Sequence, residues 1–197
     1  MSKVICLLTS NTEEINYSGL IALQKEYYSL LKNKFQPPPA GGDCIKMIHY
    51  LKRKDEDNPV KIGPYENITP FEAANRIASD LVIIKGLLQL IIQEKISSKA
   101  TFTLRLGTKH EKQKGDFSIK TNRGCYEGEA FNVAPSFYKD KLNQTLSKWR
   151  KIKEEYKIDL KYMLINNEAV IESDYKRFKT EGIKLIGVKG WDKITIK

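Results

Sequence analysis

The sequence predicts an α/β protein with a central mixed β-sheet flanked by helices. Three observations lead to this prediction. A long run of apolar residues at helical spacing begins after Thr69, and three segments with strand-like alternation follow it. Helical and strand-like segments then alternate as far as Val188. The resulting order of helix, three strands, helix, strand, helix and strand is typical of a sheet with both parallel and antiparallel neighbours.

Length and composition favour one folded domain over residues 1–197. The 197 residues are 41% hydrophobic and 10% aromatic, which excludes a disordered tail and suffices for a hydrophobic core. We expect a core over about 69–188, preceded by a helical and loop extension over 1–68.

Charge and cysteine content indicate the partner and the compartment. The formal net charge is +10 and is spread along the chain, which favours a polyanionic partner, nucleic acid first and an acidic membrane surface second. The three cysteines are far apart and show no zinc-binding spacing with the two histidines. Because the apolar run at 4–8 is too short for a signal peptide or a membrane span, we expect a soluble, cytoplasmic protein without a membrane partner.

The first 68 residues predict a strand and at least one helix. Residues 3–9 form a short apolar run typical of a buried strand, and 18–34 carry leucine and tyrosine at helical spacing. Three prolines and two glycines at 37–42 end that helix, and no phosphate-loop motif follows the glycines. The pattern over 43–54 is ambiguous between strand and helix.

A capping box marks the start of the central helix. Thr69 supplies the cap, Pro70 stands at the first helical position, and Glu72 comes three residues after the cap. Apolar residues then recur at steps of three and four up to about Glu94. We expect this helix to pack on the sheet.

A hairpin of strands follows the central helix. Residues 101–106 alternate cleanly, and a basic loop over 108–114 leads to a second pair of alternating segments, 116–120 and 125–133. The turn Thr121-Asn122-Arg123-Gly124 joins that pair. With an even turn, Lys120 faces Cys125, whereas a bulged turn would shift the pairing by one residue.

The same register places three carboxylates on one face of the hairpin. Ser118 faces Glu127 and Asp116 faces Glu129, with opposed Cβ atoms roughly 4.5 to 5.5 Å apart. Clustered carboxylates repel each other unless a cation lies among them, and oxygen ligands suit Mg²⁺ or Mn²⁺. Alternatively, Glu127 and Glu129 are ordinary solvent-facing residues of an amphipathic strand.

The remaining elements complete the α/β order. Pro135 opens a long basic helix whose apolar stripe runs from Tyr138 to Tyr156. Residues 161–165 predict a strand, 172–180 a short helix and 182–188 a last strand.

Asp116, the Glu127-Gly128-Glu129 triplet and this order of elements resemble the PD-(D/E)XK nuclease superfamily, and within it the type II restriction endonucleases. The resemblance covers roughly 69–188 and implies a restriction-endonuclease-like core. Two residues depart from the family pattern: Gly115 stands where proline is frequent, and Glu129 where lysine is usual. Some restriction enzymes have a similar Glu-x-Glu pair at this place.

The resemblance also implies roles for these residues. Asp116 and Glu127 would bind Mg²⁺, with Mn²⁺ as a possible substitute, and Glu129 would hold or orient the attacking water. Lys120 is a candidate for the cation that the family's lysine supplies. Glu72 is a possible additional ligand, with helix capping as its alternative role.

The implied activity is that of a type II restriction endonuclease: Mg²⁺-dependent hydrolysis of phosphodiester bonds at specific sequences in double-stranded DNA, carried out by a homodimer. Backbone contacts are expected from four lysines, Lys109, Lys112, Lys114 and Lys139. Two alternatives stay open: a PD-(D/E)XK nuclease acting in repair or RNA processing, and a nucleic-acid-binding module that cleaves nothing.

Overall fold

The computed structural model describes residues 3–32, 43–53, 61–93, 95–107 and 113–193. Its main sheet has five strands in the order β4-β5-β6-β7-β8. The strands are β4 (Thr101–Leu104), β5 (Phe117–Thr121), β6 (Gly124–Phe131), β7 (Leu160–Asn166) and β8 (Lys184–Val188). Neighbours among the first three are antiparallel, whereas β6, β7 and β8 run parallel. The prediction of an α/β fold with a mixed sheet flanked by helices is therefore confirmed.

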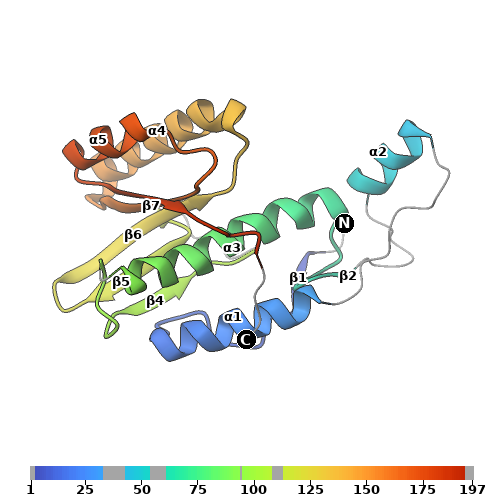
Figure 1. Ribbon diagram of the computed structural model, residues 1–197, viewed down its shortest axis with the longest axis horizontal. Coiled ribbons are helices and arrows are strands. Elements are labelled where there is room, and N and C mark those ends of the chain that lie inside the picture. Colours follow the sequence, from blue (N-terminus) through green and yellow to red (C-terminus); the bar gives the residue numbers. More distant parts are fainter. Residues whose placement is uncertain (1–2, 33–42, 54–60, 94, 108–112, 194–197) are drawn as a thin grey trace.

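Helices cover both faces of this sheet (Figure 1). On one face, α3 (Pro70–Ile92) packs its buried residues against alternate strand residues such as Phe102, Phe117 and Leu164. On the other face, α4 (Tyr138–Tyr156) and α5 (Glu172–Thr180) pack against the intervening residues, among them Phe131 and Met163. The period-two alternation of the strands thus supplies two separate apolar layers. A 3₁₀ turn, η1 (Pro135–Phe137), leads into α4.

The segment before α3 joins the α3 layer. Helix α1 (Tyr17–Leu31) contributes its buried leucines and tyrosines to the same apolar cluster as α3. A small antiparallel sheet, in the order β1-β3-β2, lies next to it and consists of β1 (Ile5–Cys6), β2 (Lys61–Ile62) and β3 (Tyr65–Glu66).

The ambiguous segment 43–54 contains a helix, α2 (Cys44–Lys52), which is capped by the Asp43 side chain. This helix projects from the body of the molecule in Figure 1 and has no buried residue. Three of its apolar side chains, Ile45, Met47 and Ile48, are about half exposed or more.

Most predicted elements are present with bounds shifted by a few residues. The central helix and its Thr69 cap are confirmed, since the Thr69 hydroxyl accepts from the Glu72 amide. The strand expected over 3–9 is confined to β1. Tyr156 lies outside the apolar stripe predicted for α4, because it is the last helical residue and is 40% exposed. Within the described ranges, no helix is both long and apolar enough to span a bilayer.

Candidate active site

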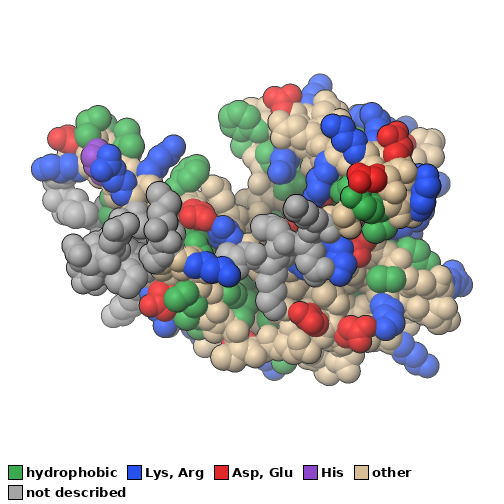
Figure 2. Space-filling view, turned by 180° about the vertical axis from the view of Figure 1, so that it is seen from behind, with side chains coloured by type: hydrophobic (Ala, Val, Ile, Leu, Met, Phe, Trp, Pro, Cys, Tyr) green, Lys and Arg blue, Asp and Glu red, His purple; other side chains and the backbone are tan. Residues whose placement is uncertain are grey.

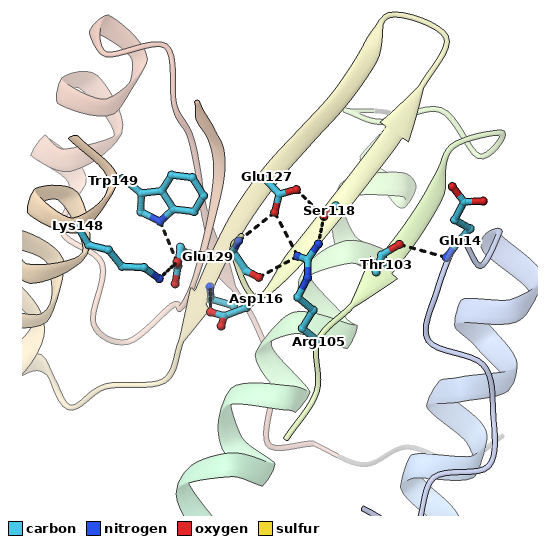
Figure 3. Close-up of polar contacts among 11 residues, drawn as sticks. Glu14, Thr103, Arg105, Asp116, Ser118, Glu127, Glu129, Lys148 and Trp149 are labelled. Atoms are coloured by element: carbon cyan, nitrogen blue, oxygen red, sulfur yellow. Dashed lines mark hydrogen bonds and ion pairs between the residues drawn. The ribbon is translucent and has the colours of Figure 1, made fainter. Parts of the chain in front are cut away.

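The β5–β6 hairpin has the register that the sequence predicts. Ser118 pairs with Glu127 and Lys120 with Cys125, and the turn joins Thr121 to Gly124. The same register extended by two residues places Asp116, just before β5, opposite Glu129. Figure 3 shows Asp116 and Glu129 next to each other on the side of the sheet where α4 lies.

Glu129 is buried and bonded to α4. Its Oε1 atom accepts from the Lys148 ammonium at 2.7 Å and from the Trp149 indole N–H at 2.8 Å. Only 8% of the residue is exposed. A carboxylate held by two donors, one of them cationic, is fixed in position. Helix α4 therefore orients this side chain.

Asp116 is less well compensated than Glu129. Its Oδ2 atom accepts one backbone hydrogen bond, from Ala130 at 2.9 Å. Burial and then the negative charge of Glu129 raise the pKa of Asp116 to about 7, against an ordinary value of 3.8. Two neighbouring carboxylates that share one lysine in this way carry excess negative charge when both are ionised. The pair therefore favours binding of a further cation or a proton.

Glu127 belongs to a separate network on the same face. Its Oε2 atom accepts from Arg105 at 3.2 Å and from the Gly115 amide at 3.0 Å, and its Oε1 atom accepts from the Ser118 hydroxyl at 2.7 Å. Arg105 in turn donates to the Gly115 carbonyl and to Ser118 (Figure 3). The Arg105 and Glu127 side chains are 4% and 11% exposed. Glu127 thus anchors the segment that carries Asp116.

Two glycines permit this close arrangement. A Cβ atom on Gly115 would lie 2.1 Å from the backbone oxygen of Gly128, and one on Gly128 would lie 2.1 Å from the Phe117 ring. A side chain at Gly115 would therefore push the two strands apart beside Asp116, and one at Gly128 would displace the buried Phe117 ring. This accounts for glycine before the aspartate and between the two glutamates.

A cleft of about 610 Å³ opens onto Asp116 and Glu129. It lies between the first half of α3, the end of β6 and α4. Cationic side chains from three elements line it together with the carboxylates: Arg76 from α3, Arg105, which follows β4, and Lys141 and Lys148 from α4. Other lining residues include Glu72, Asn75, Asp80 and Asn132. The cleft therefore combines a carboxylate pair with cations that suit a phosphate group.

The other predicted site residues have different surroundings. Glu72 lines the cleft, but its carboxylate is paired with Arg76 at 2.7 Å. Lys120 lies toward the hairpin turn and forms an exposed ion pair with Glu14 at 2.8 Å. Lys139 is exposed on the first turn of α4, and Lys114 is exposed just before Asp116. Lys109 and Lys112 lie outside the described residues.

In the described part of the chain, no group of three or more histidine, cysteine or acidic side chains is placed to hold a metal ion. The three carboxylates share a face, but Arg105 and Ser118 engage Glu127. Asp116 and Glu129 are left as a pair. One or two carboxylates, completed by water and substrate oxygens, are a common protein contribution to a Mg²⁺ site, so the pair fits such an ion in charge and ligand type.

Sequence reasoning missed the contributions of α4 to the site. Lys141 and Lys148 are seven residues apart, which is about two helical turns and places them on the same side of the helix. That spacing was available in the sequence as a signal for two cations facing one cleft. Nothing in the local pattern indicated that this side of α4 faces Glu129.

Comparison of the chain with protein-family models, with curated proteins and with solved structures gives no match.

Proposed function

We propose that this protein is a Mg²⁺-dependent nuclease that hydrolyses phosphodiester bonds in DNA at the cleft between α3 and α4. The observation that supports this most directly is the neighbouring pair of Asp116 and Glu129, which lines a cleft together with Arg76, Lys141 and Lys148. The fold order and the acidic residues of the β5–β6 hairpin, which resemble the PD-(D/E)XK nucleases, support it as well.

The contacts favour a different second metal ligand from the one implied by the sequence resemblance. Asp116 and Glu129 would hold the ion, while Glu127 keeps the strand ends in place through Arg105 and Ser118. When bound, Mg²⁺ would neutralise the carboxylate pair, polarise the phosphate and make bound water more acidic. The donors described above contact Oδ2 of Asp116 and Oε1 of Glu129, so the second oxygen of each carboxylate would be the one to face the ion.

We assign to Lys148 the role that the lysine of the PD-(D/E)XK pattern has in the nucleases that this chain resembles. Its ammonium lies 2.7 Å from Glu129 while its side chain is 52% exposed, so it can contact both the carboxylate and a substrate phosphate. From this position Lys148 would orient the attacking water and stabilise the negative charge that develops on the phosphate oxygens. Lys141 and Arg76 would position the DNA backbone in the same cleft.

The choice of substrate remains a proposal based on the resemblance: sequence-specific cleavage of double-stranded DNA by a homodimer, as in type II restriction endonucleases. A net charge of +10 supports a nucleic-acid partner. Lysine and arginine side chains are also dense on the face drawn in Figure 2, particularly over the lobe that lies opposite the projecting α2. The exposed apolar side chains of α2 offer a candidate surface for the second subunit.

The decisive experiment incubates the purified protein with a large unmethylated DNA in Mg²⁺ or in chelator. We expect discrete fragments in Mg²⁺ and intact DNA in chelator. Asp116→Asn and Glu129→Gln should each abolish cleavage. Asp140→Asn and Glu154→Gln, which make the same chemical changes at exposed positions of α4, should cleave like the wild type.

Other outcomes separate the alternatives. A smear, or cleavage confined to flaps or RNA, would favour a repair or RNA-processing nuclease. Intact DNA in every reaction would refute the nuclease proposal. Binding that is retained in chelator, unaffected by Asp116→Asn and weakened by salt would then identify a non-catalytic binding module.

A further inference from the structure

We infer that the protein has a second ligand site, at the hairpin-tip end of the main sheet, that binds a nucleoside phosphate. The site is a cavity of about 460 Å³, within the range of roughly 300 to 1,000 Å³ typical of small-molecule sites. Its described lining residues include none of those that line the cleft with Asp116 and Glu129.

Four separate segments build this cavity. They are the residues just after α3, the β5–β6 turn, the first residues of β7, and the start of β8 with the glycine before it. The turn lies at the far left of the sheet in Figure 1, away from α2. The turn begins five positions after Asp116 along the hairpin, a distance of about 17 Å at roughly 3.3 Å per residue.

The lining is strongly cationic. Lys95, Arg123, Lys161 and Lys184 contribute to it, and none of the lining residues that the structure describes is acidic. Among these four, Lys161 has an acidic partner in the described ion pairs, Asp159, at a long distance of 3.9 Å. Ser97, Thr121 and Asn122 add polar side chains. Converging cations and hydroxyls without a carboxylate favour a phosphate group over a neutral or cationic ligand.

Two tyrosines supply an aromatic surface beside these cations. The Tyr126 and Tyr162 rings meet edge to face, with centroids 6.3 Å apart. Tyr162 is buried, and the Lys184 ammonium lies 5.5 Å from its ring centre. Tyr126 is half-buried and lines the cavity. An accessible ring next to phosphate-binding cations suits a nucleobase joined to a phosphate. The nucleotide can be free or the phosphorylated end of a strand, since both present the same chemistry.

Isothermal titration calorimetry in chelator tests this inference with three probes: inorganic phosphate, dAMP and a 5′-phosphorylated dinucleotide. Chelator removes divalent ions, so binding at this site is measured independently of the proposed nuclease site. We expect one molecule of nucleotide bound per chain. Arg123→Gln and Lys161→Gln should each weaken binding by about tenfold or more, the effect of losing one charge-assisted hydrogen bond. Lys25→Gln, an equal charge change on α1, should leave it unchanged.

The aromatic contribution has its own test. Tyr126→Leu should weaken binding of dAMP by about tenfold while leaving inorganic phosphate unaffected. Tighter binding of the dinucleotide than of dAMP would identify a strand end as the ligand, and equal binding a free nucleotide. Absence of saturable binding by all three probes, or equal weakening by Lys25→Gln and Arg123→Gln, would overturn the inference.

Discussion

At the residue scale, Asp116 combines a raised pKa with a proposed catalytic role. Its pKa is about 7 in the folded protein, against 3.8 for an ordinary aspartate, chiefly because of burial and secondly because of Glu129. Between these two values the folded state binds a proton that the unfolded state has lost. Folding stability therefore falls as the pH rises from about 4 to about 7, and it stays lower above that.

Asp116→Asn should remove this dependence on pH. We expect the variant to be more stable than the wild type by about 1 to 3 kcal/mol at pH 8 in chelator, and to differ much less at pH 4. Urea unfolding at the two pH values measures the effect, with Asp140→Asn as the control. Equal stability of the variant and the wild type at pH 8 would show that the folded protein tolerates the ionised pair without cost.

Glu127 should behave differently from Asp116, because its contacts are structural. Glu127→Ala breaks the buried ion pair with Arg105 and removes the Glu127 carboxylate from a buried guanidinium, which costs about 3 kcal/mol or more. We therefore expect Glu127→Ala to lower the free energy of unfolding by this amount. Glu154→Ala, on an exposed part of α4, should cost little. A Glu127→Ala variant that is stable but fails to cleave DNA would instead support the assignment of Glu127 as a metal ligand.

At the element scale, α4 carries the cation on which the proposed chemistry depends. Lys148→Gln should lower the rate of cleavage by about 100-fold, with a smaller effect on DNA affinity, because its charge is needed most as the phosphate becomes more negative. Lys151→Gln makes the same change at an exposed position of α4 outside the cleft. Single-turnover cleavage and filter binding separate the two effects. If both variants lost the same DNA affinity and cleaved normally at saturating DNA, Lys148 would be a DNA contact without a role in the chemical step.

The packing of helices against strands also sets the limit of what the sequence predicts. A period of two and a short turn fix the hairpin register, so the positions of Asp116, Glu127 and Glu129 on one face followed from the chain alone. The rotation of α4 about its axis depends on packing against strands that are far away in sequence. The contacts of Lys148 with Glu129 therefore could not be predicted from the sequence. The burial of Arg105 could not be predicted either, because a strand pattern places this residue on the polar face.

At the scale of the whole molecule, the segment before α3 is expected to be needed for folding of the core. Tyr27 of α1 and Tyr65 of β3 are fully buried, and both donate to the Asp80 carboxylate of α3. The Gly107 amide, after β4, adds a weaker contact at 3.4 Å. Burial raises the pKa of Asp80 to about 6, so this carboxylate depends on its donors when it is ionised. The sequence indicated an extension to a core, whereas these contacts join α1 and β3 to the centre of the fold.

Deletion of residues 1–68 should therefore prevent the remainder from folding cooperatively. The fragment 69–197 would expose the apolar side of α3 that α1 covers and would leave Asp80 without its two hydroxyl donors. Thermal unfolding followed by circular dichroism tests this, and the full chain with Asp80→Asn is the matched control. That variant should retain a cooperative transition at a lower temperature, because its apolar contacts with α1 persist. A cooperative transition in the fragment would instead show that the core at 69–188 is autonomous and that α1 is an accessory layer.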